Sequence, residues 1–154
     1  MSNYLGYSLI MLVAGLGIPV MAALNGGLGS KLQSPALAAT ILFSVGLSVA
    51  IIYLLSTEGV PATLSLPNTP WYFYLGGFFV MFYILSITSI APLFGVSNAV
   101  SFVLLGQLVA MSVIDHYGLL GTTQYTINIQ RIMGLVLMAA GVFMVLSKSP
   151  EIKI

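Results

Sequence analysis

Polar side chains that could do chemistry gather in one apolar stretch, Pro92 to Gly121. The stretch predicts a membrane-spanning helix from about Val96 to Ile114. Amide and hydroxyl groups inside such a helix could offer uncharged hydrogen bonds to a ligand. The residues that carry these groups are Asn98, Ser101, Gln107 and Ser112.

Asp115 and His116 close this apolar run, and two interpretations of them stay open. Carboxylates in membranes are costly unless they are functional, and histidine is the residue type whose charge changes near neutral pH, so the two could handle protons. Alternatively, they anchor the helix end at the level of the lipid headgroups. They do not predict an enzyme, because neighbouring side chains on a helix diverge by about 100°. No serine or metal set completes a catalytic group beside them.

Helical periodicity separates the polar residues of this helix. Gln107 follows Asn98 by nine positions, which at about 100° per residue places the two side chains on opposite faces. Asn98 and Ser101 share a stripe with Ser112. One face is therefore expected to line a cavity and the other to meet a neighbouring helix or a second subunit.

The composition predicts a membrane protein. Hydrophobic residues make up 59% of the 154, charged residues 5%, and mean hydropathy is +1.10, whereas soluble domains carry roughly 25% charged residues. A net charge of +1 does not predict the basic surface that binding to nucleic acid requires. The absence of cysteine and the single histidine argue against a thiolate or multi-histidine metal site, so no metal and no cofactor are expected.

Five apolar runs predict an all-α integral membrane protein that forms one membrane domain over residues 1–154. The predicted spans are residues 4–24, 35–55, 71–91, 96–114 and 131–147. Glycines after Asn25 predict that the first helix ends there, which leaves Asn25 either as a helix cap or as a cavity-facing ligand. Ser34 and Pro35 are typical of a helix start.

The fifth span carries Gly134 and Gly141, which lie on nearly one helix face. Small residues at such spacing allow another helix to approach closely, so we expect helix packing or dimer contacts here.

The charges favour one membrane orientation only weakly. Five spans put the termini on opposite sides, with Lys31, Lys148 and Lys153 on one side and Arg131 on the other. This bias favours a cytoplasmic C-terminus but permits dual topology, in which copies insert both ways. Many transporters use two inverted repeats, and the sequence contains no second copy of itself, so another subunit would have to supply the second repeat.

Several segments resemble a known family. They are the first-span GLGIPVMAALNGGLGSKLQSPALAA, the third-span PWYFYLGGFFVMFYILS, the AP-x2-G turn at Ala91 to Gly95, GQL at Gly106 to Leu108, DHYGLLG at Asp115 to Gly121, and the last-span RIMGLVLMAAGVFMV. Together they resemble the YdcZ-type branch of the drug/metabolite transporter (DMT) superfamily across nearly the whole chain. The resemblance implies a multi-pass protein of the bacterial inner membrane. It also implies one five-helix half of an EamA-like inverted-repeat transporter, paired with a homodimer partner or a sister chain in antiparallel orientation.

Two departures limit what the resemblance implies. The branch often has glutamine four positions before Asn25, where this chain has Met21. The small multidrug exporters of the superfamily use a carboxylate in their first helix, and this first span has none, so their proton-for-cation exchange is not carried over.

The leading hypothesis is a transporter of a small solute, working as an antiparallel dimer in the lipid bilayer with the substrate cavity between subunits. The predicted substrate-binding residues are Asn25, Asn98, Ser101 and Gln107. The alternative is a non-transporting membrane subunit that assembles with or regulates another membrane protein.

Overall fold

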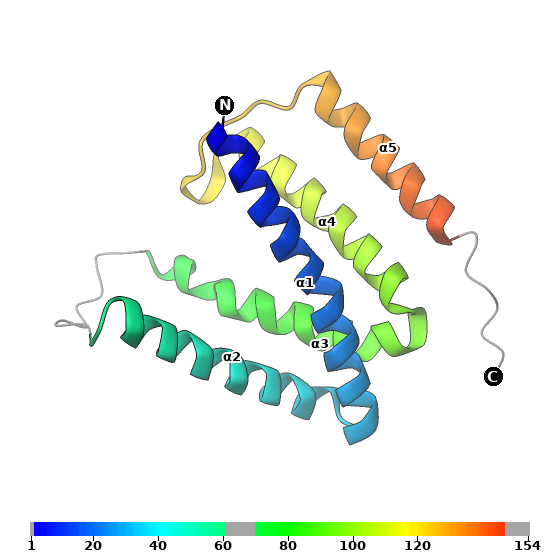
Figure 1. The fold of residues 1–154 in the computed structure, drawn as a ribbon. Coiled ribbons are helices and arrows are strands. Elements are labelled where there is room, and N and C mark those ends of the chain that lie inside the picture. Colours follow the sequence, from blue (N-terminus) through cyan, green and yellow to red (C-terminus); the bar gives the residue numbers. More distant parts are fainter. Residues whose placement is uncertain (1, 61–69, 147–154) are drawn as a thin grey trace. The chain divides into compact units, whose positions relative to one another are not determined.

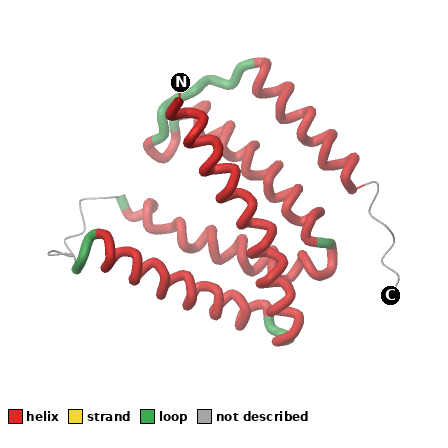
Figure 2. The backbone as a smooth tube through the Cα atoms, in the orientation of Figure 1, coloured by secondary structure: helices red, strands yellow, loops and turns green. Residues whose placement is uncertain are grey.

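The computed structural model describes residues 2–60 and 70–146, and in these ranges it contains helices and no strand (Figures 1 and 2). The predicted all-α fold is confirmed, and four of the helices are long and apolar enough to cross a membrane, whereas the described part of the fifth is shorter. The α-helices are α1 (Ser2–Leu32), α2 (Pro35–Thr57), α3 (Gly76–Phe94), α4 (Val96–Tyr117) and α5 (Ile129–Leu146). Short 3-10 helices occupy Trp71–Leu75 and Leu119–Gly121. Ser147 at the end of the predicted fifth span, Lys148 and Lys153 lie outside the described residues.

The first helix is longer than predicted. α1 runs through the glycine segment to Leu32 instead of ending at Leu24. In lipid, a helix satisfies its own backbone hydrogen bonds, which outweighs the turn preference of glycine. The glycines instead allow close packing: a Cβ on Gly29 would lie 2.8 Å from the Thr88 side chain of α3.

The turn from α1 to α2 is built from Gln33 and Ser34. The Ser34 amide donates to the Gly29 carbonyl at 3.1 Å, and the Gln33 amide donates to the Ser30 carbonyl at 3.3 Å. These two hydrogen bonds together form a Schellman motif. Ser34 then caps α2, because its Oγ accepts from the Leu37 amide at 3.2 Å. The predicted N-cap and the proline at the first helical position are confirmed.

The chain divides into two compact units, Met1–Leu93 and Phe94–Ile154. In the first unit, packing is concentrated around the C-terminal half of α1, where it meets the first turns of α2 and the second half of α3. The buried residues there are Ala22, Asn25, Gly26, Gly29, Ala38, Ala39, Ile84, Ile87, Thr88 and Ala91. By contrast, every residue of α1 from Tyr4 to Ile18 is exposed.

In the second unit α4 packs against α5. The buried residues of the described part of this unit are Ala99, Ser112 and Val142. The α4 helix ends at Gly118, which adopts the left-handed conformation (φ 59°) that favours glycine at a helix C-terminus. The connection to α5 then folds back over the end of α4.

Candidate functional site

A buried polar contact joins α1 to α3. The Asn25 Nδ2 donates a hydrogen bond to the Thr88 Oγ1, and the two residues are 4% and 1% exposed. Asn25 is not a helix cap, since α1 continues past it. Its amide nitrogen is used within the first unit, and its role toward a solute stays a prediction.

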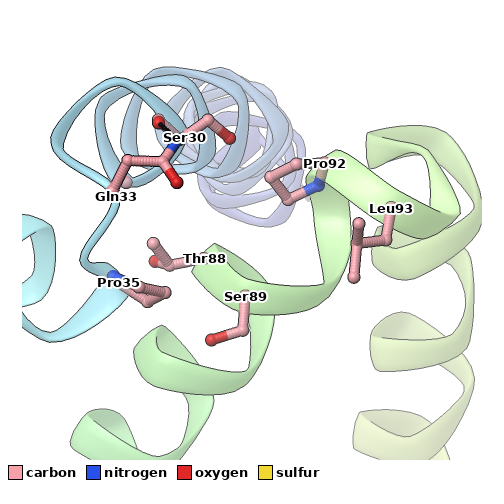
Figure 3. A pocket seen from close by; sticks show the side chains of 8 residues that line it. Ser30, Gln33, Pro35, Thr88, Ser89, Pro92 and Leu93 are labelled. Atoms are coloured by element: carbon pink, nitrogen blue, oxygen red, sulfur yellow. Dashed lines mark hydrogen bonds between the residues drawn. The ribbon is translucent and has the colours of Figure 1, made fainter.

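A pocket of about 260 Å³ opens beside this contact (Figure 3). Ser30 and Gln33 from the end of α1 face Thr88 and Ser89 from α3, with proline rings in the walls. No charged side chain lines it. No pattern in the sequence predicts this pocket.

The polar stripe on α4 is partly covered along its length. Asn98 and Ser101 are half-buried and Ser112 is buried. Asn98 Nδ2 donates to the Phe94 carbonyl at 2.8 Å, and Ser112 Oγ donates to the Leu108 carbonyl at 2.7 Å. The C-terminal part of this stripe meets α5. A pocket of about 290 Å³ there is lined by Leu108 and Ser112 of α4 and by Arg131, Gly134 and Leu135 of α5.

Gln107 is placed differently from the other three predicted substrate-binding residues. α4 is one continuous helix, so Gln107 lies opposite Asn98, on an exposed face. It is also close to the midpoint of α4. The described residues give its side-chain amide no hydrogen-bond partner. The structure therefore brings Asn98 and Ser101 onto one face, and separates Gln107 from them.

Asp115 is tied to the start of α5. Arg131 Nη2 donates to Asp115 Oδ2 at 2.7 Å, and both side chains are about one-third exposed, at 32% and 27%. The backbone carbonyl of Asp115 also accepts from the Tyr125 amide at 2.8 Å. The sequence pattern predicts Arg131 as a topology signal and not as the partner of Asp115. Asp115 ends one helix and Arg131 begins the next, and these opposite charges were the sequence signal that could have predicted the ion pair.

His116 holds the same connection in place. Its Nδ1 accepts a hydrogen bond from the Ile127 amide at 3.1 Å, and its carbonyl accepts from Gln124 Nε2 at 3.0 Å. These contacts are those of a helix-end anchor, which was one of the two interpretations. Proton handling by Asp115 and His116 stays a prediction.

Gly134 and Gly141 are exposed, and a Cβ at either position would meet nothing within 4 Å. Gly134 nevertheless lines the pocket that α5 shares with α4, beside the half-buried Leu135, and Val142 is buried. A contact between these glycines and a second chain stays a prediction.

The helices and the buried groups define a class of protein. Long apolar helices span the membrane several times, and the buried polar side chains of the described residues, Asn25, Thr88 and Ser112, are uncharged. Such a chain is a multi-pass membrane protein.

A family model described as "Putative inner membrane exporter, YdcZ" matches residues 6–144. The chain belongs to this family, the YdcZ-type branch of the drug/metabolite transporters, and is a protein of the inner membrane. An exporter family is not a class of enzymes. Comparison with curated proteins and with solved structures found no match.

Proposed function

We propose that the protein exports a small uncharged solute and that it works as an antiparallel dimer, with the solute cavity between the two copies. The family supplies the general activity. The solute class follows from Gln107, the exposed predicted ligand of α4, whose side chain is an uncharged amide.

Gln107 is the observation that carries the proposal. Its amide lies near the middle of a membrane-spanning helix, exposed and without a partner among the described residues. A carboxamide that faces hydrocarbon loses its hydrogen bonds to water, at a cost of roughly 2–7 kcal/mol. Polar side chains at this depth normally face a bundle interior or a water-filled cavity. We therefore place the exposed face of Gln107 toward the solute path.

The need for a second copy is supported by α1. Its residues from Tyr4 to Ile18 are exposed and include Gly15 and Gly17, where another backbone can approach closely. Antiparallel pairing would supply the inverted repeat on which many transporters depend. The weak charge bias of the chain permits insertion in both orientations.

Flux into proteoliposomes tests the transport activity. The probes are a broad panel of uncharged polar solutes that includes mannitol and uracil, with choline as a charged comparison. Gln107→Leu keeps the side-chain size and removes the amide, so uptake of a transported solute should fall by about two- to tenfold, the effect of one neutral hydrogen bond. Val113→Leu, on another exposed face of α4, is the matched control and should leave uptake unchanged. If no solute on the panel is carried, transport is refuted.

Orientation is tested separately by thiol labelling, because the natural chain has no cysteine. Tyr125→Cys introduces one thiol into the exposed connection between α4 and α5. A membrane-impermeant maleimide should label about half of the copies in sealed vesicles and all of them after permeabilisation. Labelling of all copies or of none in sealed vesicles would exclude an antiparallel homodimer.

A further inference from the structure

The pocket at the end of α1 differs in character from the polar stripe of α4. Its polar lining comes from Ser30 and Gln33 on one side and from Thr88 and Ser89 on the other, all within the first unit (Figure 3). Pro35 and Pro92 add apolar walls. With about 260 Å³ and no charged lining side chain, the pocket suits a molecule of a few heavy atoms.

Gln33 is an unexpected residue for its backbone position. It has φ 54° and follows the last residue of α1, at the position of the Schellman motif that glycine or asparagine normally occupies. Glycine would adopt this conformation without steric conflict. The backbone conformation therefore does not explain why glutamine occupies this position, and the contacts of its side chain do.

That side chain is fixed in a defined orientation. Gln33 Nε2 donates to the Ser30 carbonyl at 2.8 Å, which holds the amide plane and leaves the amide oxygen as an acceptor. Ser89 Oγ donates its hydrogen to the Leu85 carbonyl at 2.8 Å, so toward the pocket it can only accept hydrogen bonds. Thr88 Oγ1 already accepts from Asn25. Gln33 and Ser89 thus present hydrogen-bond acceptors on opposite sides of one pocket.

We propose that this pocket binds a small uncharged molecule that donates hydrogen bonds, of the primary amide class, with the Gln33 Oε1 and the Ser89 Oγ as its acceptors. A carboxylate of the same size would face the lone pairs of Gln33 Oε1 and Ser89 Oγ, so it should bind less tightly than the amide. An ammonium ion would find no carboxylate among the lining residues. The site uses none of the residues assigned above to the transport cavity, so binding here can be measured whether or not the protein transports.

Nuclear magnetic resonance of the purified full chain in detergent micelles, uniformly labelled with nitrogen-15 so that glutamine side chains and backbone amides are both observed, tests this site. The probes are propionamide and propionate, which match in size and differ in charge and in donor groups. Propionamide should shift the Gln33 side-chain signal in a saturable manner, and propionate should not. Gln124 is the internal control, because its Nε2 also donates to a backbone carbonyl but lines no part of this pocket.

Variants separate binding from folding. Gln33→Gly removes the acceptor and relaxes the backbone, so propionamide affinity, followed by the Ser89 amide signal, should fall by about three- to tenfold while thermal stability is kept or rises. Ser89→Ala should weaken binding to a similar extent, and the variant combining both changes should abolish it. Equal shifts of Gln33 and Gln124, equal responses to both probes, or full affinity in Gln33→Gly would each overturn the proposal.

Discussion

Removing the hydroxyl of Thr88 should destabilise the first unit through a residue on another helix. Thr88→Val keeps the shape of the side chain but leaves the buried Asn25 amide, 4% exposed, without its acceptor. An unsatisfied buried polar group costs about 1–3 kcal/mol, and cross-helix hydrogen bonds in membranes contribute about 0.6 kcal/mol on average and up to about 1.7. Because both partners are buried, we expect a loss of about 1–2 kcal/mol in the free energy of unfolding.

The assay is unfolding by sodium dodecyl sulfate in mixed micelles, followed by the fluorescence of Trp71, the one tryptophan of the chain. Thr40→Val is the matched control, because the Thr40 hydroxyl donates only to the Ala36 carbonyl of its own helix and is exposed; its effect should stay within about 0.5 kcal/mol. In a double-mutant cycle, Asn25→Ala combined with Thr88→Val should cost about 1 kcal/mol less than the two single changes together. Additive effects, or a Thr88→Val variant as stable as the parent, would refute a hydrogen bond that stabilises the α1–α3 contact.

Two further substitutions test other contacts. Gly29→Ala places a Cβ 2.8 Å from the Thr88 side chain, so it should lower the free energy of unfolding by about 1–3 kcal/mol in the same assay. Gly27→Ala is the control, because a Cβ there meets nothing within 4 Å, and it should leave stability unchanged or raise it by up to about 1 kcal/mol. Asp115→Asn removes the charge that pairs with Arg131; because both side chains are partly exposed, stability should change by about 1 kcal/mol or less and solute flux should persist if Asp115 is an anchor. Loss of flux in a stable Asp115→Asn protein would instead support proton handling.

Local rules predicted the helices and the start of α2 well. Apolar runs longer than a bilayer needs gave the spans, and Ser34 with Pro35 gave the beginning of α2. The same kind of rule failed at the end of α1, because the glycines after Asn25 serve close packing against α3 rather than a turn.

Contacts between distant segments could not be predicted in the same way. The 3.6-residue period placed Asn98 and Gln107 on opposite faces of α4, as observed, but gave no means of knowing which face packs inward. Asn25 and Thr88 are 63 positions apart, and nothing local pairs them. Gln33 carried no signal at all, since its position in a Schellman motif is one where glycine or asparagine would have been expected.

The length of α1 has a consequence for the surrounding lipid. At a rise of about 1.5 Å per residue, its 31 residues extend about 46 Å, against a hydrocarbon thickness of about 30 Å. α1 must therefore tilt or protrude into the headgroup layer, at a cost of fractions of a kcal/mol per ångström of mismatch. Thicker bilayers favour an upright α1, so acyl-chain length acts on the first unit through the tilt of this helix.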